Sequence, residues 1–164
     1  MPQVQLSTNN RHWQVKPAIL ADQTDPTITD TDPLGDDNVT ICKDQNLAKF
    51  VFAGSGDNLT ASVTIHGWSQ IGGGDWMPTL IGKFSLTCGS TTGAASRDFD
   101  ANDYFVDTIT LVDGDDSARI ISGVANKIGS LTVDLEGATR VEVCASDLDG
   151  SGESTELKYA VSFF

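Results

Sequence analysis

Residues 62–68 read SVTIHGW, and in this stretch apolar Val63 and Ile65 alternate with polar Thr64 and His66. Side chains of a β-strand point alternately to the two faces of a sheet, so this period of two predicts a strand with one buried face and one face in water. Short runs of β-branched and aromatic residues, separated by Gly, Asp, Asn and Ser, repeat the pattern along the chain. We expect strands at residues 39–42, 48–52, 61–68, 80–88, 105–112, 119–122, 130–135, 140–145 and 157–163.

Helical signals are weak by comparison. No window shows an apolar stripe at the 3.6-residue period of a helix, and Gly123 interrupts the best candidate, ISGVANKI at residues 121–128. Strands without helices between them indicate an all-β fold, in which two antiparallel sheets pack as a β-sandwich. We expect a jelly-roll topology first and an Ig-like sandwich second.

The N-terminal part has a different composition. Residues 21–38, ADQTDPTITDTDPLGDDN, hold six Asp and two Pro but few apolar groups, and such a segment buries too little surface to form a regular element alone. We therefore divide the chain into an extended arm or long loop at residues 1–35 and a β-sandwich domain at residues 36–164. Residues 13–16 have two interpretations: part of an arm that becomes ordered on a partner, or the first strand of the sandwich.

The apolar side chains of this arm are expected to find contacts outside a lone monomer, on a sister subunit or on another protein. The predicted partner-binding residues of the arm are Val4, Leu6, Trp13, Val15, Ile19 and Leu20.

Charge and hydropathy restrict the possible partners. The net charge of -13 repels phosphate backbones, and no apolar run approaches the roughly 18 residues that a membrane helix requires. We expect neither a nucleic-acid nor a membrane partner. The N-terminal MPQVQLSTNNRHW lacks the features of a secretory signal, which predicts assembly in a cytoplasm with Cys42, Cys88 and Cys144 as reduced thiols. A disulfide between two of these cysteines is the alternative.

The stretch SDLDGSGESTELK, residues 146–158, resembles the start of a calcium-binding loop. Oxygen ligands are expected at loop positions 1, 3 and 5 with Gly at position 6, but position 12, which should be a bidentate Glu, is Lys158. The flanking alternation and the glycines favour a hairpin turn that pairs residues 140–145 with residues 157–163. No cofactor or metal is expected, and the weak candidate metal ligands are Asp147, Asp149, Ser151 and Glu153.

Two tryptophans flank a glycine triplet in HGWSQIGGGDWMP, residues 66–78. Exposed tryptophans beside a flexible loop could stack on sugar rings, which makes a carbohydrate-binding module one alternative. The other interpretation places Trp68 in the core, because tryptophans of small sandwiches are usually buried. We also count Trp68 and Trp76 among the predicted partner-binding residues.

Catalytic signatures are sparse. His12 and His66 are the only imidazoles, and the sequence has no G-x-S-x-G, H-E-x-x-H or phosphate-binding Gly-rich motif. We predict no catalytic residues and no enzymatic activity.

The C-terminal half carries a resemblance to a class of proteins. A DTITL strand, the segment SGVANKIGSLTVDLEG, an RVEV strand and a final apolar strand follow in order between residues 101 and 164. This succession resembles small virion structural proteins of tailed bacteriophages, in particular capsid decoration (cement) proteins.

The resemblance implies a mechanical function on the capsid surface of a virion that is assembled in the host cytoplasm. It implies two partners, the major capsid protein and further copies of this chain in a homotrimer. Several contacts made by one trimer would clamp neighbouring capsid subunits. A head-fibre base or a tail part is an alternative place in the virion.

Overall fold

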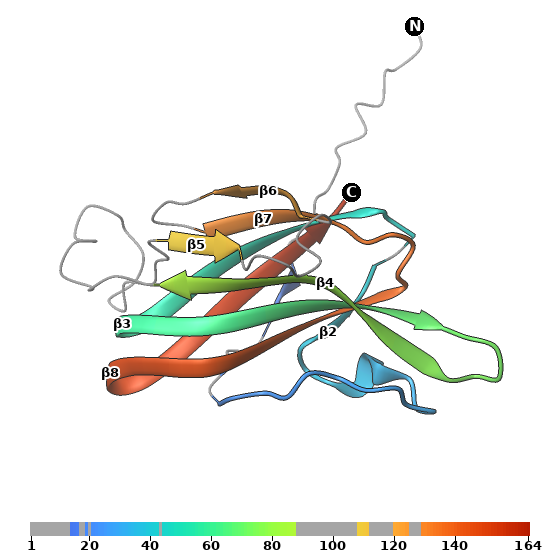
Figure 1. The fold of residues 1–164 in the computed structure, drawn as a ribbon, viewed down its shortest axis with the longest axis horizontal. Helices are drawn as coiled ribbons and strands as arrows, with labels where there is room; N and C mark the ends of the chain where they lie inside the picture. Colours follow the sequence, from blue (N-terminus) through green and yellow to red (C-terminus); the bar gives the residue numbers. More distant parts are fainter. Residues whose placement is uncertain are drawn as a thin grey trace, which may run out of the picture.

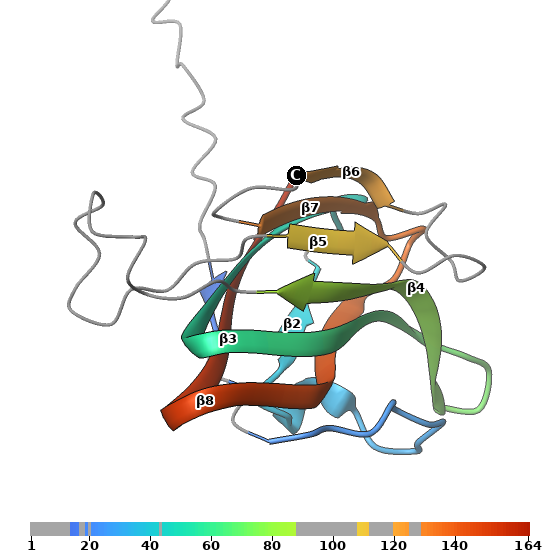
Figure 2. The same cartoon turned by 60° about the vertical axis from the view of Figure 1, so that its left-hand side comes forward.

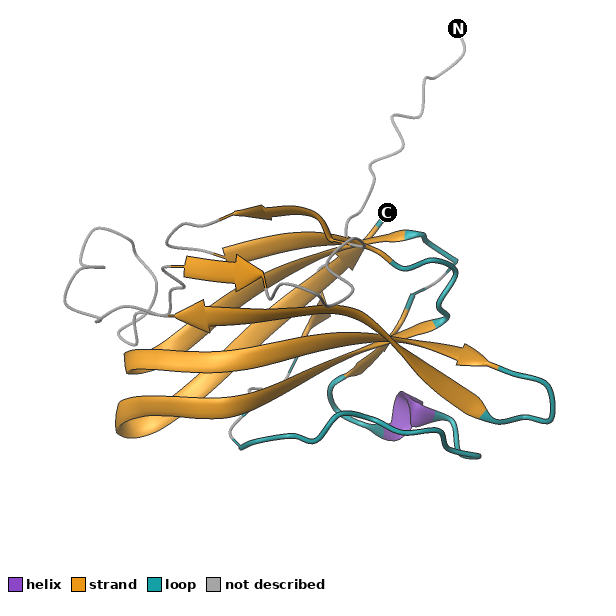
Figure 3. Cartoon of the chain, in the orientation of Figure 1, coloured by secondary structure: helices purple, strands orange, loops and turns teal. Residues whose placement is uncertain are grey.

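In the computed structural model, the backbone is described for residues 14–16, 19, 21–42, 44–87, 108–111, 120–124 and 129–164. Side chains are described in these ranges except at residues 15, 53–58, 108–111, 120–129 and 150–155. Figure 3 shows that strands make up most of this part of the chain. None of the described residues forms a helix long and apolar enough to cross a membrane.

In the described ranges, the elements are strands and one short helical turn. They are β1 (Gln14–Val15), the 3-10 turn η1 (Pro33–Gly35), β2 (Val39–Ile41), β3 (Leu47–Gln70), β4 (Trp76–Thr87), β5 (Thr108–Leu111), β6 (Ile120–Val124), β7 (Gly129–Asp134) and β8 (Arg140–Phe163). Each strand pairing is antiparallel. The predicted all-β, antiparallel sandwich is confirmed, while the choice between jelly-roll and Ig-like topology stays a prediction.

Two long strands, β3 and β8, connect the layers of the sandwich. In the first layer, residues 47–55 of β3 lie between β7 and residues 156–163 of β8, and β6 and β1 lie outside them. In the second layer, residues 60–70 of β3 lie between β4 and residues 140–149 of β8, and β5 and β2 lie outside them. Figures 1 and 2 show both long strands turning back together from one layer into the other.

The predicted hairpin between residues 140–145 and 157–163 is wrong. Both segments belong to the continuous strand β8, and each pairs with a different part of β3. The Gly-rich stretch at residues 146–158 is therefore the bend of β8, and its register with β3 shifts at residues 55, 57, 60 and 62. Such bulges increase local twist and let a strand change sheets. Asp147 adopts a positive φ of 53° at the start of this bend.

Side chains from the two layers meet in one apolar core. Phe50, Phe52 and Phe84 are fully buried, and the rings of Phe52 and Phe84 pack edge to face with centroids 5.2 Å apart. Val63 and Ile65 are buried in this core, as their alternation predicts. Their polar neighbours depart from the prediction, because Thr64 and His66 are also buried instead of facing water. Another part of the chain must cover the outer face of the second layer.

The described N-terminal residues lie against β8. Gln14 and Val15 pair with Val161 and Ala160, and Ile19 exchanges backbone hydrogen bonds of 2.8 and 3.1 Å with Leu157. Part of the predicted arm is thus joined to the sandwich as an edge strand, which is the second interpretation given above for residues 13–16. Residues 1–13 lie outside the described part of the chain.

Candidate functional site

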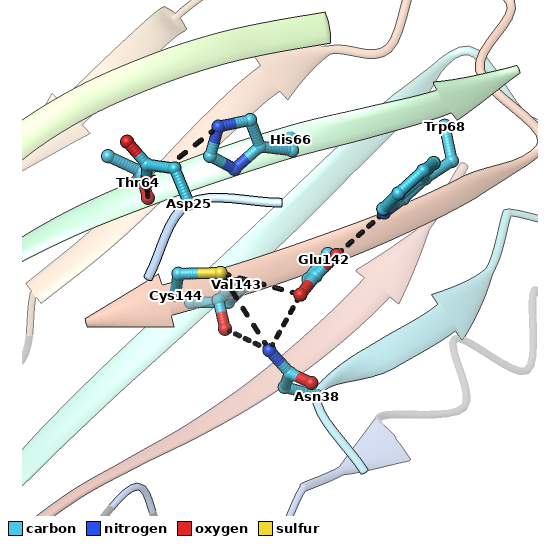
Figure 4. Close-up of polar contacts among 8 residues, drawn as sticks. All are labelled: Asp25, Asn38, Thr64, His66, Trp68, Glu142, Val143 and Cys144. Atoms are coloured by element: carbon cyan, nitrogen blue, oxygen red, sulfur yellow. Dashed lines mark hydrogen bonds and ion pairs between the residues drawn. The ribbon is translucent and has the colours of Figure 1, made fainter. Parts of the chain in front are cut away.

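The covered outer face of the second layer holds buried polar side chains, among them Thr64, His66 and Glu142. Its centre consists of cross-strand neighbours from β3 and β8, namely the pairs Thr64 and Cys144, His66 and Glu142, and Trp68 and Arg140. Residues 21–38, which we call the acidic loop, lie over this face. Figure 4 shows how Asp25 of the loop lies beside Thr64 and His66.

The acidic loop is attached mainly by polar contacts. The Gln23 amide donates to the Ala145 carbonyl at 2.8 Å, and the Asp22 carboxylate accepts from the Leu148 amide at 3.1 Å. Farther along, Thr29 and Trp76 exchange two backbone hydrogen bonds of 3.1 and 2.7 Å. The only loop residue that is fully buried is Pro33. The loop is therefore positioned by hydrogen bonds more than by apolar packing.

Glu142 is the buried carboxylate of this face, with 8% of its surface exposed. It accepts hydrogen bonds from Trp68 Nε1 at 2.7 Å, from Asn38 Nδ2 at 3.2 Å and from the Cys144 thiol at 3.4 Å. Burial, followed by the negative charge of Glu142, raises the pKa of Cys144, so this thiol keeps its proton and can donate it. The donors to this carboxylate are all neutral.

The two ring nitrogens of His66 have different surroundings. Its Nε2 lies 3.9 Å from Asp25 Oδ1, while the hydroxyl of Thr64 donates to the same oxygen at 2.8 Å. Its Nδ1 is buried without a hydrogen-bond partner. Burial lowers the pKa of His66, and the charges of Asp25 and Glu142 oppose this effect. The imidazole is thus held mostly neutral under the loop.

The two tryptophans do not form an exposed platform. Trp68 and Trp76 are only 3% and 7% exposed, and the guanidinium of Arg140 lies over the Trp76 ring, 4.9 Å from its centroid. Arg140 also contacts the Asp32 carboxylate of the loop at 3.3 Å. These positions support the interpretation of Trp68 as a buried residue and leave neither ring available for stacking on a sugar.

A shallow groove of about 600 Å³ runs between the acidic loop and the sheet. Trp68 and Glu142 contribute to its lining from the sheet, and the acidic loop lines the remainder, mostly with carboxylates and threonines. The loop residues along it are Thr24, Asp25, Pro26, Thr27, Thr29, Thr31, Asp32, Pro33, Gly35 and Asp36.

A second surface feature lies at the tip of the β3–β4 hairpin. Thr29 pairs with Trp76 in an antiparallel bridge, which places Ile28 opposite Met77. Met77 also pairs with Ser69 of β3 on its other side. Ile71 follows Ser69 by two residues. Opposed residues and residues two apart share a face, so Ile28, Met77 and Ile71 lie on one side of the tip. All three are exposed, Ile28 by 60%. We call these three residues the tip strip.

The remaining predicted site residues are distributed as follows. Ile19 is buried against the core, Val15 is described by its backbone only, and Val4, Leu6, Trp13 and Leu20 lie outside the described residues. Among the described residues, no group of three or more His, Cys, Asp or Glu could hold a metal ion. Asp147 and Asp149 are exposed on β8, and the side chains of Ser151 and Glu153 are not among those described.

Cys42 and Cys144 are free, buried thiols, and burial raises the pKa of Cys42 to about 12. Cys88 lies outside the described residues. Neither described thiol is therefore prepared to act as a nucleophile, because reactivity requires the thiolate.

The sequence did not single out Glu142, Asn38, Cys144 or Asp25. The alternation in VEVCA, residues 141–145, places Glu142 and Cys144 on one face, and this was the available signal. Asn38 and Asp25 join them through contacts across 104 and 39 residues of sequence, for which a single sequence offers no sign.

Comparisons of this chain with protein-family models, with curated proteins and with solved structures find no match.

Proposed function

We propose that this chain is a structural virion protein that binds the outside of a phage capsid and stabilises it by clamping neighbouring subunits, as a homotrimer. The proposal begins from the resemblance of residues 101–164 to capsid decoration proteins. The structural observation that carries it is the tip strip, in which exposed apolar residues of the β3–β4 hairpin and of the acidic loop lie side by side on an acidic chain. Contiguous exposed apolar residues usually mark a contact with another protein.

The tip strip supports a contact of useful strength. Burying an Ile or Met side chain contributes about 1.5–3 kcal/mol relative to leaving it in water, so three such residues could supply the apolar centre of an interface. One contact of this size is weak alone because association itself has a large entropic cost. Three copies in a trimer would act together at high effective concentration, which fits a clamp better than a soluble monomer.

The charge of the chain supports a protein partner with a basic or neutral surface. A net charge of -13 repels nucleic acid and keeps free copies soluble at the high concentration that a decoration protein reaches in an infected cell. It also predicts that binding weakens as salt screens the attraction to a basic partner surface. We place the assembled protein on the capsid exterior, with the major capsid protein as its partner.

The test is a co-sedimentation assay with purified capsids of the virus that encodes the chain. The double substitution Ile71→Ser and Met77→Ser is expected to weaken capsid binding by about five- to twentyfold, because burial of the two partly exposed side chains, each 38% exposed, contributes about 1–2 kcal/mol together. The matched control is Ile41→Ser, which alters an exposed isoleucine of β2 outside the tip strip. Equal binding of the tip variant and the control would contradict a role for the tip, and absence of binding by the unmodified chain would contradict the proposed function.

A further inference from the structure

The acidic loop covers the imidazole of His66, whose surroundings favour the neutral ring with a single proton. His66 Nε2 faces the Asp25 carboxylate, whereas Nδ1 is buried with no hydrogen-bond partner. In the neutral ring, a proton on Nε2 faces the Asp25 carboxylate 3.9 Å away, and Nδ1 is an unused acceptor. Protonation turns Nδ1 into a buried charged donor that lacks an acceptor, which is unfavourable in a closed site.

The titratable and charged groups around His66 come from the acidic loop, β8 and β4. The loop contributes Asp25, β8 contributes Glu142 and Cys144, with Arg140 farther along the same face, and β4 contributes Lys83 opposite Thr64. The two carboxylates favour the charged ring, but loss of water on burial outweighs them and lowers the pKa of His66. A state in which water reaches His66 therefore binds the second proton more readily than the closed state does.

The loop that excludes this water is easy to displace. Its large apolar side chains, Ile28 and Leu34, are exposed, and its attachment consists of hydrogen bonds and the ion pair of Asp32 with Arg140. Segments with few buried apolar contacts open locally at a small fraction of the global free energy of unfolding. The loop can thus open while the sandwich stays folded.

We propose that the acidic loop is a pH-sensitive cover on the second layer, which opens when His66 takes up its second proton. Opening exposes the buried contact between Trp68 and Glu142 to water and leaves the core intact. This inference does not depend on the proposed capsid function, because it concerns an equilibrium within one chain.

Hydrogen exchange of backbone amides, measured by NMR between about pH 7.5 and about pH 5.5, tests the proposal. Ordinary carboxylates titrate below this pH range, so they do not contribute to the response. The amides of Gln23, Thr29 and Trp76 report on loop attachment, because each donates across the loop–sheet boundary. Their protection factors are expected to fall by up to about tenfold per pH unit, the limit for one linked proton. Residues 47–52 of β3 in the first layer are expected to keep their protection.

The chain offers a matched pair of variants, since His12 is its only other histidine. His66→Gln is expected to abolish the pH response of the three amides, whereas His12→Gln is expected to keep it. If the loop amides stay protected while the His66 ring titrates, or respond equally in His66→Gln, the proposal is wrong. Simultaneous loss of protection in β3 would also overturn it, because the response would then be global unfolding.

A ring titration of the unmodified protein provides a second measurement should His66→Gln fail to fold. The midpoint of the His66 ring resonances is expected to coincide with the midpoint of loop opening. Separate midpoints would contradict the proposal.

Discussion

The indole Nε1 of Trp68 donates a hydrogen bond of 2.7 Å to Glu142 Oε2 between neighbouring strands, and both side chains are buried. Trp68 is in the half of β3 that enters the second layer, and Glu142 is in the corresponding half of β8. The contact therefore depends on the shared bend of the two long strands and on the loop that covers them. Hydrogen bonds to a buried charge contribute about 1.5–3 kcal/mol each, so this pair is a sensitive point of the fold.

Replacing Glu142 by Ala is expected to reduce the free energy of unfolding by about 1–3 kcal/mol, because Trp68 Nε1 loses its acceptor in a buried site. Asn38 Nδ2 keeps the Val143 carbonyl as an acceptor at 2.9 Å. Urea denaturation monitored by tryptophan fluorescence measures the change. Asp149→Ala removes an exposed carboxylate from the same strand and is expected to stay within about 0.5 kcal/mol of the unmodified protein. Equal effects of the two substitutions would show that the Glu142 contacts contribute nothing specific.

Gly67 packs closely against Ala138 and Ile81. A Cβ atom at this position would be 2.8 Å from Ala138 Cβ and 2.9 Å from Ile81 Cδ1. Gly67→Ala is expected to destabilise the protein by about 1–3 kcal/mol through overpacking. Gly72→Ala is the control, since no atom lies within 4 Å of a Cβ added in that loop. Thermal melts of the two variants compare them directly, and an unchanged melting temperature for Gly67→Ala would refute this close packing.

Stability is expected to decrease on mild acidification because of His66. Burial lowers its pKa from the ordinary value of 6.5, so the unfolded chain binds the proton more readily than the folded chain. The contribution of the neutral ring is complete above about pH 6.5 and is lost as the pH falls from there toward the folded-state pKa. Chemical denaturation at several pH values measures this slope. His66→Gln should flatten it, and a slope that persists in this variant would assign the effect to other groups.

Metal removal is expected to leave the fold unchanged. The stretch at residues 146–158 is the bend of β8. Lys158 occupies the position at which a calcium loop has its bidentate Glu, and its Nζ contacts Glu156 Oε2 at 3.1 Å. A bend of paired strands needs backbone freedom at its glycines and not a cation. Melting temperatures with and without a chelator should agree, and a decrease of more than about 5 °C, roughly 2 kcal/mol, would identify a metal that stabilises the fold.

The core could be predicted from the sequence, and the reason is the period of two. Val63, Ile65, Val141 and Val143 alternate with polar neighbours and all lie in the core. The length of the strands could not be predicted in this way. Strands usually have 3–10 residues, so the Gly-, Asp- and Ser-rich stretches within β3 and β8 were interpreted as turns, whereas they are bends in two strands of 24 residues each.

Most of the candidate site could not be predicted from the sequence, because a segment without a periodic pattern covers it. Thr64 and His66 alternate as a hydrated face would, and what buries them is a loop whose composition indicates no contact at all. The loop is held by backbone groups and carboxylates, such as Asp22 with the Leu148 amide across 126 residues. Contacts of this kind leave no periodic pattern, because any residue can supply the backbone partner.

Electron microscopy of capsids tests the central claim most directly. Capsids lacking this protein, assembled from the major capsid protein of the same virus, would be imaged before and after addition of the purified chain. We expect additional density with threefold symmetry at regular positions on the outer surface, and we expect the decorated capsids to withstand higher temperature. Capsids that remain bare at saturating protein concentration, or density found only on a tail or fibre, would contradict the central claim.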